Sequence, residues 1–210
     1  MENILHYSFH TGSRRIWFIG SSHVYWANRS ASTRPGGLNL NLQDIGGSLS
    51  WHGKRGMRWG DLIPTIERLL DDQPPPDFIL IQLGSNDLGL RTGTNLILNM
   101  EIDILRLNVL LPSTKIIWSE ILQRRYWHNA MNGKAVERAR KRVNLAIKNL
   151  VSSINGYTIR HCNIRAREIH LYRNDGTHLS DAGLRIYLNT IQGALESFLT
   201  TFNSNIFPQS

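Results

Sequence analysis

Short apolar runs that alternate with longer stretches of helical periodicity constrain the fold of this chain more than any other feature. The clearest run, residues 78–83, is apolar almost throughout, which is typical of a central strand buried on both faces. Similar runs at residues 16–19, 49–51, 115–119 and 157–162 predict four further strands. Strands that alternate with helices in this way predict an α/β fold with a parallel sheet.

Five segments between and after these runs place apolar residues on one helical face. In residues 94–111, for example, Met100, Ile104 and Leu107 recur at helical spacing, and Pro112 follows as a stop. With five strands and five helices, we expect a three-layer α/β/α sandwich around a five-stranded parallel sheet. The predicted helices span residues 22–31, 60–72, 94–111, 133–153 and 181–199, while residues 38–45 fit neither pattern clearly.

The chain is basic and of a length that suits one domain. Its 210 residues fit one domain better than two. Lys and Arg number 24 against 16 Asp and Glu, so the net charge is +8. This excess favours an anionic partner such as nucleic acid, although a solvated basic surface with no dedicated ligand explains it equally well.

Cys162 is the single cysteine, so no internal disulfide can form, and this suits a reducing compartment. Because Cys162 falls in the strand predicted at residues 157–162, we expect a buried, unreactive thiol. No CxxC or HExxH sequence indicates a metal site, and no apolar stretch is long enough to span a membrane. The N-terminus lacks the pattern of a signal peptide, so we expect an intracellular protein, cytoplasmic or nuclear.

Polar residues and a glycine follow the predicted strands at the edge where open parallel sheets bind ligands. Ser22 follows the first strand, Gly56 the second and Asn86 the third, while Asp175 and His178 follow the fifth. An Asp three positions before a His can accept a hydrogen bond from Nδ1, which leaves Nε2 free to act as a base. Each residue alone has an ordinary explanation as a helix cap or a turn, but their convergence on one edge favours a site.

Four short blocks of the chain resemble those of the SGNH (GDSL-like) hydrolase family. They occur in the family's order between about residues 16 and 199, and they read Gly20-Ser21-Ser22-His23, Gly56, Gly84-Ser85-Asn86-Asp87 and Asp175-Gly176-Thr177-His178. The resemblance implies a flavodoxin-like sandwich in one domain over residues 1–210, with a core of about 14–200 and flexible ends.

The same resemblance implies a role for each matched residue. Ser22 is then the nucleophile, His178 the base and Asp175 the acid of a catalytic triad. The backbone N–H groups of Ser22 and Gly56 and the side-chain amide of Asn86 would form the oxyanion hole. This chemistry needs no metal or organic cofactor.

The chain departs from the family at Ser21, where the family usually has Asp. That Asp is not the acid of the triad, so the triad survives the change. The loss of its local hydrogen bonds would still alter the loop and the rate. Ser21 also competes with Ser22 as a nucleophile by position alone, and the match to the family favours Ser22.

A segment after the fourth predicted strand, residues 123–128, mixes cations with flat rings. Arg124, Arg125 and Trp127 in this segment suit an anionic or stacking ligand, although a surface loop around a buried Trp127 explains them slightly better. Trp59, close to Gly56, is a candidate for the wall of the site.

Residues 56–59, 118–120 and 124–127 also bear a looser resemblance to esterase-like domains encoded by vertebrate transposable elements. That resemblance implies work near nucleic acid or membranes.

The sequence therefore predicts a serine esterase that hydrolyses a small, acetyl-like ester through Ser22, His178 and Asp175. The alternative is a non-catalytic module of the same fold that binds nucleic acid through its basic surface, which the serine at position 21 and the net charge of +8 favour modestly. A nucleotide enzyme is disfavoured, because no P-loop or GxGxxG follows a strand. The acyl group, the alcohol and the oligomeric state are not predicted.

Overall fold

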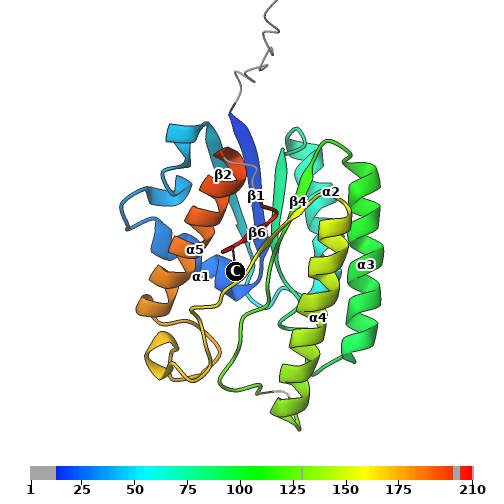
Figure 1. Ribbon diagram of the computed structural model, residues 1–210, viewed down its shortest axis with the longest axis vertical. Helices are drawn as coiled ribbons and strands as arrows, with labels where there is room; N and C mark the ends of the chain where they lie inside the picture. The colour runs from blue at the N-terminus through cyan, green and yellow to red at the C-terminus, as the bar shows by residue number, and fades with distance from the viewer. Residues whose placement is uncertain (1–12, 129, 201–203, 210) are drawn as a thin grey trace, which may run out of the picture.

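A computed structural model of the chain describes residues 13–128, 130–200 and 204–209. Among these residues, six strands form a fully parallel sheet in the order β2-β1-β3-β4-β5-β6 (Figure 1). The strands are β1 (Arg14–Gly20), β2 (Gly47–Gly53), β3 (Phe78–Gln82), β4 (Lys115–Ser119), β5 (Tyr157–Ile159) and β6 (Ile206–Phe207). The predicted α/β class with a parallel sheet is confirmed.

The sheet has one strand more than the five predicted. The extra strand, β6, lies in the C-terminal segment that was expected to be flexible, and it pairs with β5 along Thr158 and Ile159. Two residues are too few to show a strand pattern in a sequence, so this strand depends on its pairing with β5. Of the N-terminal segment expected to be flexible, residues 1–13, all but Ser13 lies outside the described residues.

The fifth strand is shorter than predicted, and this changes the environment of Cys162. β5 ends at Ile159, so Cys162 lies beyond the sheet and its side chain is exposed. The expectation of a buried thiol was therefore wrong, because it depended on extending the strand to residue 162.

Helices flank the sheet on both faces, as in the predicted sandwich. They are α1 (Ser22–Ala31), α2 (Leu62–Asp72), α3 (Gly93–Leu110), α4 (Gly133–Ser153) and α5 (Asp181–Thr200). Two of them, α1 and α4, have the predicted bounds, whereas α2 begins two residues late because residues Trp59–Asp61 form a 3₁₀-helix. Residues 38–45, which fitted neither pattern, largely belong to two further 3₁₀-helices, Gly37–Asn39 and Leu42–Ile45.

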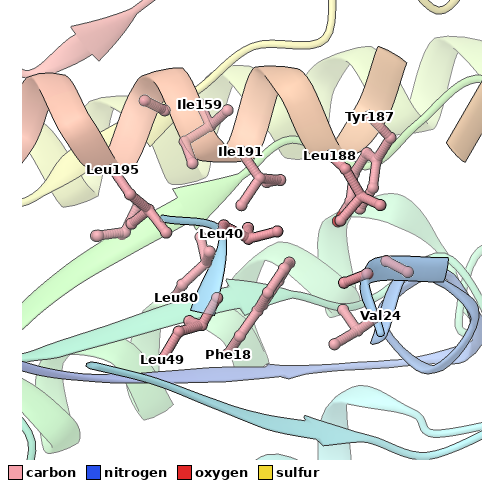
Figure 2. Close-up of a cluster of buried hydrophobic side chains, with 14 of the residues drawn as sticks. Phe18, Val24, Leu40, Leu49, Leu80, Ile159, Tyr187, Leu188, Ile191 and Leu195 are labelled. Carbon is pink, nitrogen blue, oxygen red and sulfur yellow. The ribbon is translucent and has the colours of Figure 1, made fainter. Parts of the chain in front are cut away.

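Two hydrophobic clusters hold the layers together, one on each face of the sheet. Successive residues of a strand point to opposite faces, so Phe18 of β1 packs toward α1 and α5 while Trp17 packs toward α2, α3 and α4. Figure 2 shows the first cluster, where Leu188, Ile191 and Leu195 of α5 lie over side chains of the strands. Both central strands, β1 and β3, are buried on both faces, which explains their nearly continuous apolar sequence.

The strand order creates a switch point between β1 and β3. From β1 the chain passes to β2 on one side, and it later returns to β3 on the other side of β1. Loops that leave neighbouring strands in opposite directions open a crevice at the carboxyl ends of those strands. Ser22 follows β1 and Asn86 follows β3, so both lie at this edge.

Candidate active site

Ser22 is the first residue of α1, directly beyond the carboxyl end of β1. The turn into the helix is tight, because a Cβ atom on Gly20 would come within 2.5 Å of the carbonyl oxygen of Gln82 in β3. The first N–H groups of a helix have no intrahelical acceptor and carry the positive end of its dipole. The backbone N–H of Ser22 is therefore available to an anion beside its own hydroxyl.

His178 connects Ser22 to Asp175 through two hydrogen bonds. Its Nδ1 lies 2.7 Å from Asp175 Oδ2, and its Nε2 lies 3.1 Å from Ser22 Oγ, which is 156 residues away in the sequence. Because a carboxylate can only accept, Nδ1 carries the proton and Nε2 accepts from the serine hydroxyl. This is the tautomer in which a histidine can remove a proton from serine.

The loop from Asp175 to His178 is built around the Asp175 carboxylate. Its Oδ1 accepts the backbone N–H groups of Thr177 and His178, both at 2.8 Å, and Gly176 adopts φ +62° to complete the turn. Burial alone would raise the pKa of Asp175, but the hydrogen bonds from His178 and Thr177 outweigh it and lower the pKa to about 2. Asp175 is therefore a carboxylate at neutral pH and holds the ring orientation of His178.

Asn86 is oriented by hydrogen bonds on both sides of its amide. Its Nδ2 donates to the carbonyl of Met57 at 3.1 Å, and its Oδ1 accepts from Arg124 Nη2 at 3.0 Å. This pattern fixes which end of the amide is nitrogen, and it leaves the second hydrogen of Nδ2 for another acceptor. Gly56, one residue before Met57, is exposed at φ +74° with no atom within 4 Å of where a Cβ would lie.

A cavity of about 320 Å³ lies beside the Ser22–His178 pair, and neither of these two residues is among those that line it. Gly56 and Asn86 line it from the loops after β2 and β3, and Thr177, next to His178, lines it from the loop before α5. The Asp87 carboxylate, three residues into the turn after Gly84, accepts the backbone N–H of Trp59 at 3.0 Å and so ties the first two loops together. Burial raises the pKa of Asp87, while the hydrogen bond from Trp59 opposes the rise.

Two of the four aromatic and basic candidates line the same cavity. Arg124 and Trp127 do so, with the Arg124 guanidinium 5.0 Å from the Trp127 ring centre. Arg125 stacks on Tyr126 and lies outside the lining. Trp59 is buried at 2% exposure with its Nε1 donating to Asp103, so it supports the cavity from the core and does not face it.

Two contacts at the candidate site were not predicted from the sequence. His23, directly after Ser22, is buried, and its Nε2 donates to the carbonyl of Thr177 at 3.2 Å. Arg124 holds Ser85 and Asn86 through Nη2, at 3.0 Å from each acceptor. A polar residue after the serine and an arginine in the aromatic segment were visible signals, but their partners depend on the tertiary fold.

Within the described ranges, no group of three or more His, Cys, Asp or Glu side chains is placed to hold a metal ion. A search of the same residues for a helix with the length and apolarity of a membrane span finds none.

Comparisons with known proteins bear on the fold. No family model matches the chain, and no curated protein sequence matches it. Among solved structures, a GDSL-like lipase from Bacteroides thetaiotaomicron aligns over 89% of each chain with a TM-score of 0.68 and 16% identity. A lipase/acylhydrolase from Enterococcus faecalis aligns over 88% of this chain and 96% of that one, with a TM-score of 0.62 and 17% identity.

The acetylxylan esterase Axe2 from Geobacillus stearothermophilus is similar over 88% of this chain and 94% of its own, with a TM-score of 0.63 and 14% identity. These similarities cover 88–89% of this chain, at sequence identities too low to carry an activity. The chain has the fold of the SGNH (GDSL-like) hydrolases.

Proposed function

We propose that this protein is a serine esterase of SGNH type that hydrolyses a small, acetyl-like ester. The observation that carries the proposal is the continuous hydrogen-bonded path from Asp175 through His178 to Ser22, with contacts of 2.7 and 3.1 Å. A serine hydroxyl is a weak nucleophile at neutral pH unless a neighbouring base removes its proton, and this path supplies that base.

In the proposed reaction, Ser22 Oγ attacks the acyl carbon while His178 Nε2 takes its proton. Asp175 stabilises the imidazolium that forms, and His178 then gives the proton to the departing alcohol oxygen. A water molecule, deprotonated by His178 in turn, attacks the acyl-enzyme, the bond from the acyl carbon to Ser22 Oγ breaks, and His178 returns the proton to Ser22 Oγ as the acid leaves. Each step moves one proton between the histidine and an oxygen, so a single base serves both halves of the cycle.

The oxyanion of the tetrahedral intermediate is assigned to three donors. They are the backbone N–H groups of Ser22 and Gly56 and the second Nδ2 hydrogen of Asn86. Preorganised donors of this kind contribute about 3 kcal/mol each to lowering the barrier. Arg124 supports the role of Asn86, because its bond to Oδ1 prevents the amide from rotating its oxygen toward the oxyanion.

The size of the cavity supports a small acyl or alcohol group. A volume of about 320 Å³ lies at the low end of the range for ligand pockets. An acetylxylan esterase is among the solved structures of similar fold, which agrees with an acetyl-like substrate. Binding of nucleic acid through the basic surface stays a prediction, because none of these contacts tests it.

Covalent labelling tests the proposal directly. A fluorophosphonate should modify the protein at Ser22, and 4-nitrophenyl acetate should be hydrolysed by the unmodified protein. Ser22→Ala and His178→Ala should abolish labelling and lower kcat by at least about 10⁴-fold.

Ser21→Ala is the matched control for this experiment. Ser21 is fully buried and its Oγ has no hydrogen-bond partner in the described part of the chain, so it cannot reach a substrate. The Ser21 variant should be labelled and active like the parent. Labelling at any residue other than Ser22, or equal rates for parent, Ser22→Ala and His178→Ala, would refute the proposed function.

A further inference from the structure

The guanidinium of Arg124 is fixed in the wall of the cavity. Its Nη2 donates to Ser85 Oγ and Asn86 Oδ1, both at 3.0 Å, and the group stacks on Trp127. Its Nε is buried and has no hydrogen-bond partner in the described ranges. The contacts with Ser85, Asn86 and Trp127 hold the guanidinium in one position, whereas the side chain of a solvent-exposed arginine samples many positions.

The positive charge of Arg124 has no carboxylate partner within the described ranges. Three Arg–Glu ion pairs occur there, and none includes Arg124. The charge of Asp175 acts on Arg124 from a distance, but the oxygens of that carboxylate already accept from His178 and Thr177.

Burial lowers the pKa of Arg124 to about 10, against the opposing influence of Asp175, so the group remains charged at neutral pH. A charge in a partly desolvated position is costly unless an opposite charge accompanies it. We therefore expect the ligand to carry the negative charge that balances Arg124.

The rest of the cavity agrees with an anionic ligand. Its lining holds two arginines, Arg124 and Arg58, and no Asp or Glu side chain. Leu88, Leu90 and Ala130, together with the Trp127 ring, supply the apolar part of the wall. Arg58 is exposed and solvated, so Arg124 is the one desolvated cation in this lining. One desolvated positive charge is balanced by the single negative charge of a carboxylate, whereas a phosphate would bring about two.

We propose that the natural ester carries a carboxylate a few bonds from its scissile carbonyl, and that Arg124 binds this carboxylate. The position follows from Asn86, which accepts from Arg124 through Oδ1 while its Nδ2 is the proposed oxyanion donor. The side-chain amide of Asn86 therefore separates the carboxylate-binding guanidinium of Arg124 from the proposed oxyanion hole. This proposal rests on the esterase function above and names the substrate class of the same site.

Two pairs of esters test the proposal, each pair differing only in one negative charge. One pair is 4-nitrophenyl hydrogen succinate and its methyl ester, which places the charge on the acyl side. The other is 4-acetoxybenzoate and its methyl ester, which places the charge on the leaving alcohol. In each pair, the preference is kcat/KM for the charged ester divided by kcat/KM for the neutral ester.

The comparison is made between the parent and Arg124→Met, because intrinsic differences in ester reactivity then cancel. We expect the preference in at least one pair to fall by about 10- to 100-fold in Arg124→Met, the range for a hydrogen bond to a charged group. Arg124→Lys, which keeps the charge, should retain part of it. The loss should appear mainly in KM of the charged ester.

Arg125→Met is the matched control, since it removes the same charge from the next residue, which lies outside the cavity lining. It should keep the preference of the parent. The proposal is overturned if the preference in both pairs is the same in the parent and in Arg124→Met, or if Arg125→Met loses it equally. Hydrolysis of the neutral esters that still depends on Ser22 would then leave the esterase function intact. Hydrolysis that does not depend on Ser22, or none at all, would overturn both.

Discussion

His23 Nε2 donates a hydrogen bond to the carbonyl oxygen of Thr177 at 3.2 Å, and so joins the residue after the proposed nucleophile to the residue before the proposed base. Burial, with the nearby charge of Arg124, lowers the pKa of His23 to about 3. His23 is therefore neutral over the working range of an esterase. It can position the loop that carries His178 without placing a second positive charge beside the imidazolium.

Replacement of His23 separates positioning from simple packing. In His23→Gln an amide N–H remains for the Thr177 carbonyl, whereas His23→Phe leaves that carbonyl without a donor. An unsatisfied buried acceptor costs about 1–3 kcal/mol, and if this cost falls on the loop that positions His178, His23→Phe should lose about 5- to 150-fold in kcat while KM changes little. Rescue by His23→Gln in steady-state kinetics on 4-nitrophenyl acetate checks the prediction. Equal losses in both variants would mean that His23 acts only by filling space.

Asn86→Ala should lower kcat by about 10²- to 10³-fold on 4-nitrophenyl acetate with little change in KM. The reason is that the amide donor is proposed to act on the oxyanion, which exists only after attack. Asn149→Ala, at an exposed position of α4, is the control and should leave both constants unchanged. A rise in KM at constant kcat would assign Asn86 to substrate binding instead.

Most of the sheet could be predicted from the sequence, because its strands and helices have patterns of their own. The run at residues 78–83 and the helix Gly133–Ser153 are local signals that tertiary packing leaves unchanged. β6 and the end of β5 could not be predicted, because two or three residues pair only where a neighbour is already in place.

The same division applies to the site. Ser22, Asp175 and His178 stood out through sequence blocks, and the structure brings them within hydrogen-bond distance. The contacts from His23 to Thr177 and from Arg124 to Asn86 join residues 154 and 38 positions apart, and nothing local in the sequence records such a pair.

Asp175→Asn should reduce kcat by about 10³- to 10⁴-fold at neutral pH, because the amide no longer holds His178 in the tautomer that accepts from Ser22.

The same variant makes a prediction about acid stability. The folded pKa of Asp175, about 2, lies below its ordinary value of 3.8, so the stabilisation is present above pH 3.8 and is lost as pH falls through 2. The difference in unfolding free energy between parent and variant, measured by urea titration, should therefore shrink between pH 4 and pH 2. Asp72→Asn, at an exposed position, should show no such change.

His161 predicts a second pH dependence, in a higher range. Its Nε2 lies 2.8 Å from Ser119 Oγ, its ring stacks on Tyr187 in the core, and burial lowers the pKa of His161 to about 3. The folded pKa lies below the ordinary value of 6.5, so the unfolded chain binds the proton first as pH falls. Stability should be lost progressively from pH 6.5 toward pH 3, by up to about 1.4 kcal/mol per pH unit for this one group.

His161→Gln removes this titration while keeping an amide near Ser119. Between pH 6 and pH 5, the parent should lose about 1 kcal/mol more unfolding free energy than the variant, as measured by urea titration. His170→Gln, at an exposed position, should keep the slope of the parent. Because His23 is buried with a lowered pKa of the same sign, His161→Gln should retain a residual slope, and only the double variant His23→Gln/His161→Gln should flatten the curve further. If parent and His161→Gln have parallel curves from pH 7 to pH 5, His161 binds its proton equally well in the folded and unfolded chain, and its burial does not govern its charge.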